Sequence, residues 1–200
     1  MIAPETTALI LLAAGKSARF GLSDKLTEIF LGQPLGMHVV TALEAVPFAR
    51  RVVVRDGVQL DYAARGYHEV HNTRPEEGLS LSLKMGVEAA RGPGIEAVLV
   101  ALADMPRVTA AQIYRLFDAA SGADAIVASS DGVHPKPPAL FGANRFDALV
   151  ALEGDSGARD LILAGRHVVT HPDELIDVDT EEELGELMAK FGQVRGRQEF

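Results

Sequence analysis

The sequence predicts an α/β fold: a three-layer sandwich in which helices cover both faces of a mostly parallel central sheet. Short apolar runs alternate along the chain with stretches whose apolar residues recur at helical spacing, which is typical of strands joined by right-handed helical crossovers. Hydrophobic residues make up 48% of the 200 positions and charged residues 24%, as in domains that bury one core. Neither a linker-like segment nor an internal repeat interrupts this pattern. We therefore expect a single domain over residues 1–191, followed by a polar tail over residues 192–200.

The predicted strands are short apolar runs, the pattern of strands buried on both faces of a parallel sheet. The first run is residues 8–13 (ALILLA), which Gly15 closes. Three similar runs follow at residues 51–55, 97–102 and 123–128. These runs supply the expected interior strands of the sheet.

Helices are predicted where apolar residues share one face. The first begins at Pro34, a residue that favours helix starts, and runs to residue 45. Two more cover residues 79–90 and 109–120. Thr109 is the expected N-cap of the second of these, with Gln112 as its capping-box partner.

The second half of the chain is less regular. Three prolines between residues 135 and 138 argue against a central strand there and leave residues 139–141 for a pairing at the sheet edge. Asp155 or Ser156 is the expected N-cap of a helix that runs to about residue 164.

The charge balance narrows the classes of partner. Lys and Arg number 19 against 28 Asp and Glu, a formal net charge of −9, which opposes binding to duplex nucleic acid. No apolar run approaches the ~18 residues that a membrane helix needs, and Glu5 stands where a signal peptide would carry Lys or Arg. The chain has no cysteine, so a catalytic metal would need oxygen or imidazole ligands. We expect a cytoplasmic protein that binds neither nucleic acid nor membrane.

The most informative stretch is residues 12–21 (LAAGKSARFG), which follows the first predicted strand. A Walker loop would need glycine at position 10, which is Ile10, and the dinucleotide fingerprint fails because its glycine spacing is absent. A third design fits: a turn of small residues at the carboxyl end of a buried strand exposes backbone N–H groups to an anion. Arg19 and Lys25 supply cations for a triphosphate from the same loop.

This loop resembles the signature of the MobA/MocA-like nucleotidyltransferases of molybdenum-cofactor assembly, Leu-Ala-(Ala/Gly)-Gly-x-Ser-x-Arg-Met-Gly followed by Lys. Phe20 stands where the signature has Met. The resemblance spans nearly the whole chain and implies the fold of the nucleotide-diphospho-sugar transferases, a GT-A-like Rossmann variant. All the matching positions except Gly21 are then expected to bind the nucleotide. The positions that match are Leu12, Ala13, Ala14, Gly15, Ser17, Arg19, Gly21 and Lys25. An ordinary strand-turn-helix connection that carries two cations is the alternative.

A second stretch, residues 72–83 (NTRPEEGLSLSL), resembles the family segment in which serines and the backbone at a helix start approach the nucleotide. The resemblance implies that Asn72, Gly78, Ser80 and Ser82 bind the nucleotide. The alternative for Ser80 is a purely structural role as helix N-cap.

Asp104 is the first candidate metal ligand. It lies in residues 102–106 (LADMP), at the carboxyl end of an apolar strand, where open α/β sheets bind ligands. Mg²⁺ prefers one or two carboxylates together with phosphate oxygens and waters, so Asp104 and a triphosphate are sufficient to seed a site. The segment also matches the family's Leu-x-Asp-Met-Pro motif. The alternative is that Asp104 caps the helix that follows Pro106.

Asp177 and Asp179 are further candidate metal ligands, with Asp179 the first choice of the two. Residues 177–179 are expected to end a short strand, and side chains two residues apart on a strand face the same side, where like charges favour a bound cation. The segment resembles the Asp-Ile-Asp-Thr sequence before the family's last helix. Thr180 is expected to cap a helix over residues 181–191, and a capping box with Glu183 is the purely structural alternative.

Residues 154–159 (GDSGAR) match the family's Gly-Asp-x-Gly-Ala-Arg motif, so Asp155 and Arg159 are candidate acceptor-binding residues. The alternative is an ion pair between them at the surface, four residues apart on a helix. Upstream, the family often has Gly-His-Pro before Leu-Phe, whereas this chain has residues 136–141 (KPPALF). His134 lies three residues too early and takes the place of the family histidine only if an insertion shifts it.

The resemblance implies a Mg²⁺-dependent nucleotidyltransferase in which Mn²⁺ can replace Mg²⁺. An oxygen of the acceptor's phosphate attacks the α-phosphorus of a nucleoside triphosphate and pyrophosphate leaves. Lys25, Arg19 and the metal on Asp104 neutralise the developing charge. The implied acceptor is molybdopterin, and the implied macromolecular partner is a molybdoenzyme that receives the product. Ala14, where guanylyl-transferring relatives tend to carry Gly, favours CTP, and we expect a monomer or a weak homodimer.

Two alternatives remain open. The first is a transferase that uses GTP, or that modifies a sugar phosphate or methylerythritol phosphate, since such transferases share the same Ala-Ala-Gly form. The second is a non-catalytic insertion chaperone that carries a nucleotide or pterin cofactor to a partner enzyme. Loss of Lys25 or Asp104 would favour the chaperone, and both residues are present.

Overall fold

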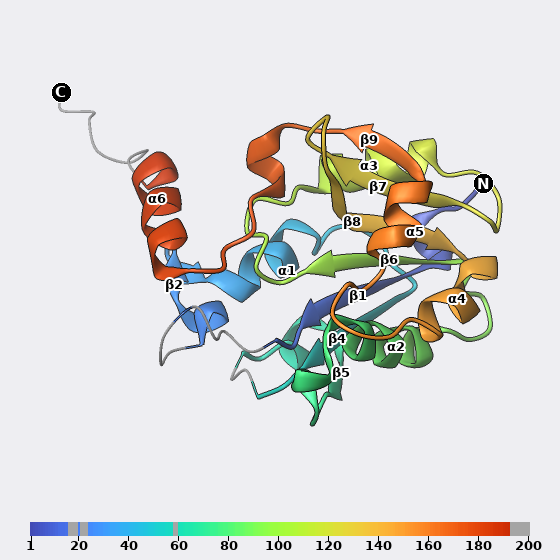
Figure 1. Cartoon of the computed structure of the whole chain (residues 1–200), viewed down its shortest axis with the longest axis horizontal. Helices are drawn as coiled ribbons and strands as arrows, with labels where there is room; N and C mark the ends of the chain where they lie inside the picture. The colour runs from blue at the N-terminus through green and yellow to red at the C-terminus, as the bar shows by residue number, and fades with distance from the viewer. Residues whose placement is uncertain (16–19, 21–23, 58–59, 193–200) are drawn as a thin grey trace.

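The computed structural model describes residues 1–15, 20, 24–57 and 60–192. Within that part of the chain a seven-stranded sheet forms the centre of the molecule, and helices pack on both of its faces (Figure 1). Its strands are β1 (Thr7–Ala13), β4 (Arg50–Arg55), β5 (His68–His71), β6 (Ala97–Leu102), β7 (Ile126–Ser130), β8 (Pro135–Gly142) and β9 (Arg166–Val169). A separate hairpin joins β2 (Ile29–Phe30) to β3 (Gln33–Pro34).

The strand order is β5-β4-β1-β6-β8-β7-β9. β1 pairs in parallel with β4 and β6, β4 with β5, and β7 with β9, so the expected α/β sandwich with a mostly parallel sheet is confirmed. The chain builds β4 and β5 on one side of β1 and then returns to place β6 on its other side. This reversal between β1 and β6 is where open sheets of this kind bind ligands, at the carboxyl ends of the strands.

The first three predicted strands agree with β1, β4 and β6 to within one residue. The fourth, expected at residues 123–128, begins later, at Ile126. The N–H of Ala125 donates to the carbonyl of Gly122 at 3.1 Å, and Gly122 has a φ of +75°, so a tight turn takes up the start of the apolar run.

The expectation that the prolines exclude a central strand is wrong, because β8 lies between β6 and β7. Its pairing with β6 begins only at Ala139, opposite Val100, after the last proline. Pro135 and Lys136 pair with β7 alone, past a register shift at Ala128 and Ser129. The proline segment therefore has one neighbour, and a residue without an N–H is tolerated where no second strand needs it.

The helices are α1 (His38–Ala42), α2 (Leu79–Ala90), α3 (Ala110–Ala119), α4 (Phe146–Val150), α5 (Arg159–Ala164) and α6 (Glu181–Phe191). The predicted α2, α3 and α6 are confirmed. Thr180 caps α6 as expected, and with Glu183 it forms the capping box that was the structural alternative for this segment. The helix expected from Pro34 to residue 45 is shorter. Pro34 belongs to β3 and pairs with Ile29, and a 3-10 turn, η3 (Leu35–Met37), precedes α1.

Three other local predictions are wrong. Thr109 caps α3, but the side chain of Gln112 donates to the hydroxyl of Ser129 on β7 instead of completing a capping box. α5 begins at Arg159 without a side-chain cap, because residues 154–157 form a turn with positive φ at Gly154 and Gly157. Residues 177–179 form no strand.

Alternating side chains of the strands divide the core between the two faces of the sheet. One face carries Leu9, Leu11 and Leu99 under α1 and α3, and the other carries Ile10 and Val98 under α2, α4 and α5. A third apolar cluster holds α6 beside the β2–β3 hairpin, as Figure 1 shows. The residues of this third cluster are Phe20, Phe30, Leu35, Val178, Leu184 and Leu187. Among the described residues, none of the helices has the length and apolar character that a membrane span requires.

Candidate active site

A cavity of about 270 Å³ opens at the carboxyl ends of β1 and β6, where the strand order reverses. It brings together the start of the glycine loop, a lysine and the three candidate metal carboxylates. The residues concerned are Leu12, Ala13, Ala14, Gly15, Lys25, Asp104, Asp177 and Asp179. These sequence-predicted residues, 167 positions apart at the extremes, therefore share one site. Ser17 and Arg19 lie outside the described residues, as does the polar tail beyond residue 192.

Lys25 lies between two carboxylates. Its Nζ is 2.7 Å from Oδ2 of Asp104 and 3.0 Å from Oδ1 of Asp179. A short 3-10 turn, η2 (Lys25–Thr27), positions it, and the Asp24 side chain caps that turn by accepting from the N–H of Leu26. Only 13% of the Lys25 side chain is exposed, so the ammonium is held in a largely desolvated position.

Asp104 lies two residues after the end of β6, and its backbone carbonyl accepts from the N–H of Val178 at 3.0 Å. Val178 is fully buried, so this bond pins the segment between Asp177 and Asp179 against the strand end. The helix after Pro106 is α3, whose N-cap is Thr109, so the alternative in which Asp104 acts as a helix cap is wrong.

The electrostatics of the pair follow from burial. Burial raises the pKa of Asp104, and the nearby Asp177 and Asp179 raise it further against the opposing effect of Lys25. Burial lowers the pKa of Lys25, but its contacts with Asp104 and Asp179 outweigh burial and raise that pKa above its usual value. Lys25 therefore stays protonated, and the carboxylate of Asp104 depends on a neighbouring cation.

The carboxylates fit a hard divalent cation. Oδ1 of Asp104 is buried and accepts no hydrogen bond from the described residues, so one carboxylate oxygen is available to a ligand. Carboxylate oxygens are the donors that Mg²⁺ and Mn²⁺ prefer. The described residues contain no ready-made group of three or more metal-binding side chains, and Asp177 pairs with Lys136, 3.0 Å away. Asp104 and Asp179 would then hold the cation with oxygens of the nucleotide.

The glycine loop presents open backbone. Gly15 has no heavy atom within 4 Å of a built Cβ, and its N–H donates to Oδ2 of Asp56 at 3.2 Å. Ala14 and Gly15 also line a neighbouring cavity with Gly78 and Asp155. Sequence reasoning assigned Asp56 no role. Its position directly after β4, the neighbour of β1, could have indicated a place in the site, because ligands bind at the carboxyl ends of such strands.

The four candidate nucleotide-binding residues around the start of α2 lie in different surroundings. Gly78, with a φ of +95°, lines the cavity, and a side chain there would meet the carbonyl of Gly154 at 2.7 Å. Asn72 and Ser82 are buried and bond to each other at 2.9 Å. The Ser80 hydroxyl is buried without a partner among the described residues and makes no cap, so the N-cap alternative for Ser80 is wrong.

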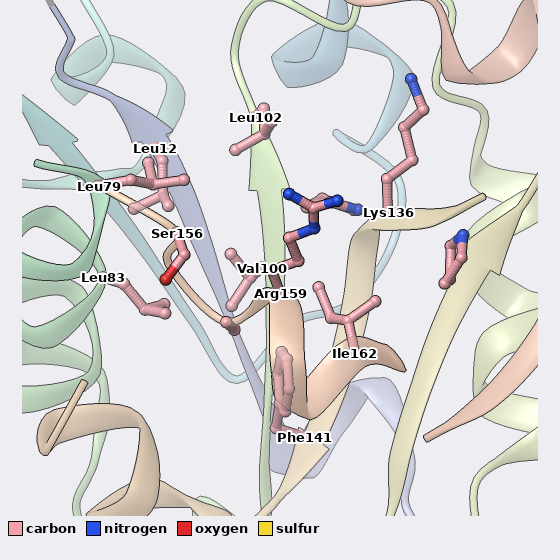
Figure 2. A pocket seen from close by; sticks show the side chains of 13 residues that line it. Leu12, Leu79, Leu83, Val100, Leu102, Lys136, Phe141, Ser156, Arg159 and Ile162 are labelled. Atoms are coloured by element: carbon pink, nitrogen blue, oxygen red, sulfur yellow. The ribbon is translucent and has the colours of Figure 1, made fainter. Parts of the chain in front are cut away.

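A second cavity of about 230 Å³ adjoins the first and shares Leu12, Leu79 and Leu102 with it. Its walls are mainly apolar, and Figure 2 shows Arg159 and Lys136 across the pocket from Leu12 and Leu79. The polar side chains that line it are Lys136, Ser156 and Arg159.

The candidate acceptor residues occupy different places. Arg159 lines the second cavity, whereas Asp155 lines the cavity that contains Gly78 and Gly15. No ion pair joins Asp155 to Arg159 among the described residues. The side chain of His134 is 79% exposed in the β7–β8 turn beside Asp131, and it lines neither cavity. Lys136, two residues on, lines the second cavity instead, and sequence reasoning assigned it no role. The signal was a lone cation inside a proline-rich strand.

Comparison with known proteins identifies the family: the model for the MobA-like NTP transferase domain matches residues 9–169. The chain belongs to the MobA-like NTP transferase family. Its members are nucleotidyltransferases that take a nucleoside triphosphate, and the fold is of the nucleotide-diphospho-sugar transferase type. The cavity at β1 and β6 lies within the matched region except for the last carboxylates, Asp177 and Asp179.

The chain is also similar to individual proteins. The purine catabolism protein PucB of Bacillus subtilis is 31% identical over 191 residues, which covers 87% of this chain and 92% of PucB. The Rv0371c homologue from Mycobacterium sp. strain JC1 is 25% identical, with a TM-score of 0.76 and coverage of 96% and 99%. Rv0371c of Mycobacterium tuberculosis, solved in complex with manganese, is 20% identical, with a TM-score of 0.70 and coverage of 92% and 98%.

Proposed function

We propose that this transferase moves CMP from CTP onto the phosphate of molybdopterin or a closely related pterin, releases pyrophosphate, and uses Mg²⁺ or Mn²⁺. The observation that carries the proposal is Lys25 held between Asp104 and Asp179 beside the glycine loop. That cavity adjoins an apolar pocket with two cations. In this proposal the nucleotide site and the acceptor site share a wall.

In the reaction, an oxygen of the acceptor's phosphate forms a bond to the α-phosphorus. The bond from the α-phosphorus to the bridging oxygen breaks, and pyrophosphate leaves with that electron pair. Little covalent chemistry is required of the protein, so positioning and charge neutralisation supply the rate. The bound divalent cation supplies charge neutralisation and a template for the phosphates.

Each residue of the site has a role in this scheme. Asp104 and Asp179 would hold the cation, and Lys25, protonated because of its raised pKa, would donate to the triphosphate. Ala13, Ala14 and Gly15 present backbone to the nucleotide. We also assign Arg19 and Ser17 to the triphosphate, on the signature alone.

The apolar pocket favours a pterin over a sugar as the acceptor. A sugar phosphate carries hydroxyls that need hydrogen-bond partners when buried, and Ser156 is the one hydroxyl among the described residues that line the pocket. A pterin carries polar atoms only at the edge of its ring, and its two flat faces gain from contact with Leu83, Val100 and Phe141. Arg159 lies there to attract the acceptor's anionic group.

The remaining features of the proposal are a cytoplasmic protein, monomeric or weakly dimeric, whose product passes to a molybdoenzyme. Retention of the Lys25–Asp104 pair favours catalysis over a chaperone role. The test is release of pyrophosphate from each of the four nucleoside triphosphates, with Mg²⁺ and either molybdopterin or a sugar phosphate. We expect release with CTP and molybdopterin. Release with a sugar phosphate alone would overturn the acceptor assignment.

A further inference from the structure

Lys136 lies between two cavities. It lines the apolar pocket, which is the cavity of about 230 Å³ described above. It also lines a groove beside α6, and Asp177 and Glu183 line the same groove. It belongs to the part of β8 that pairs with β7 alone, opposite Ser129, so no strand covers it on the β6 side. The side chain is about one-third exposed, at 32%. Its position lets the ammonium reach a molecule in either cavity.

The present partner of Lys136 is exchangeable. Its Nζ lies 3.0 Å from Oδ1 of Asp177, whose side chain is 47% exposed. An ion pair this exposed adds little stability, so an anionic ligand can replace Asp177 at low cost. Arg159, the second cation of the pocket, makes no ion pair with any described residue.

The charge of the pocket differs from that of the whole chain. The protein carries a net charge of −9, yet the apolar pocket is lined by Lys136 and Arg159 without a carboxylate. Two cations over an apolar floor suit a ligand with an anionic group and an apolar body. Figure 2 shows both cationic side chains on the side of the pocket opposite Leu12 and Leu79, with Arg159 nearer to Leu102, at the end of β6. Leu102 also lines the cavity of Lys25 and Asp104.

We propose that Lys136 is the residue that binds the acceptor's phosphate and selects, with Arg159, a phosphomonoester carried on a planar heteroaromatic ring. The inference rests on the proposed function and adds to it a specificity-determining residue. Lys136 leaves Asp177 and pairs with the incoming phosphate. The phosphate is then held at the wall that the two cavities share, next to the nucleotide.

The test uses a pterin phosphomonoester and the matching pterin alcohol, whose binding is followed by pterin fluorescence with the full-length protein. Lys136→Met keeps the length of the side chain and removes the charge. We expect it to weaken binding of the phosphomonoester about 10- to 100-fold, the loss of one charge-assisted bond. Binding of the alcohol should change less than about twofold because it lacks the anion. Lys136→Arg should keep most of the affinity for the phosphomonoester.

Lys190→Met is the matched control. Lys190 also pairs with an aspartate, Asp173, and lines the α6 groove but not the apolar pocket. It should leave both affinities unchanged. The inference is overturned if Lys136→Met binds the phosphomonoester as tightly as the wild type, or loses both compounds equally. It is also overturned if the wild type binds neither pterin.

Pyrophosphate release separates this inference from the proposed function. A charge-dependent loss of phosphomonoester binding in a protein that transfers no nucleotide to any pterin supports the phosphate role of Lys136 and refutes the proposed reaction. Transfer to molybdopterin that is unaffected by Lys136→Met, at subsaturating acceptor, supports the reaction and refutes the role of Lys136.

Discussion

Replacing Asp104 with Asn tests whether this carboxylate holds the metal. Asn keeps the shape of the side chain, and its carbonyl oxygen can still accept from Lys25. At the observed 2.7 Å and an effective dielectric of about 20, the gross attraction that is lost is about 6 kcal/mol. Desolvation of the charges costs several kcal/mol and largely offsets that attraction, since only 13% and 20% of the two side chains are exposed. We therefore expect the free energy of unfolding to change by only about 1–2 kcal/mol.

Function should respond far more strongly than stability. Asn carries no charge to hold Mg²⁺ against its hydration shell, so turnover should fall by at least about 10² and recover little at raised Mg²⁺. Titration of Mn²⁺ in the presence of CTP, followed by electron paramagnetic resonance, gives a readout that does not depend on turnover. Asp179→Asn should weaken the metal less, because Asp179 is more exposed, at 32%.

The control for both variants is chemical unfolding, which shows whether the protein is intact. Mg²⁺-dependent activity within tenfold of the wild type, together with unchanged Mn²⁺ binding in Asp104→Asn, would refute the reasoning. The metal would then belong elsewhere, and Asp177 with Asp179 would be the next pair to test.

The remaining predictions concern Lys25 and the nucleotide base. Lys25→Ala should lower kcat about 10²–10³-fold with a smaller effect on the KM for CTP; a rise in KM alone would mean ground-state binding only. Lys25→Met leaves Asp104 buried without its cation, so the pKa of Asp104, already raised by burial, rises further. Because a raised carboxyl pKa in the folded state means stability lost as pH increases, the variant should lose up to about 3 kcal/mol between pH 5 and pH 8, measured by urea unfolding. The double variant Lys25→Met/Asp104→Asn should show little of that loss. If the free energy of unfolding changed with pH equally in the single and the double variant, the loss would not come from Asp104. CTP should be preferred over GTP by about 1–3 kcal/mol in kcat/KM, because the methyl of Ala14 narrows the cavity that it lines; equal turnover with GTP would reject this.

Local features of the site could be predicted from the sequence because they depend on neighbouring residues. The run that forms β1, the exposed glycine after it and Asp104 at the end of β6 are all set by hydrophobic pattern and position in the chain. Lys25 could also be predicted, because it follows the loop at the spacing that the signature gives. The capping box of Thr180 and Glu183 is equally local, since its hydrogen bonds span only three residues.

Only the tertiary structure decided what depends on contacts between distant segments. The prolines of β8 favoured an edge strand, yet the strand is central because its pairing with β6 stops at Ala139, before the prolines. Asn72 bonds to Ser82, and Gln112 to Ser129, because folding buries these polar groups together and each needs a partner. Lys136 reaches Asp177 across 41 residues of chain. No local pattern encodes such a pair, since the free energy that selects it comes from the packing of the whole sheet.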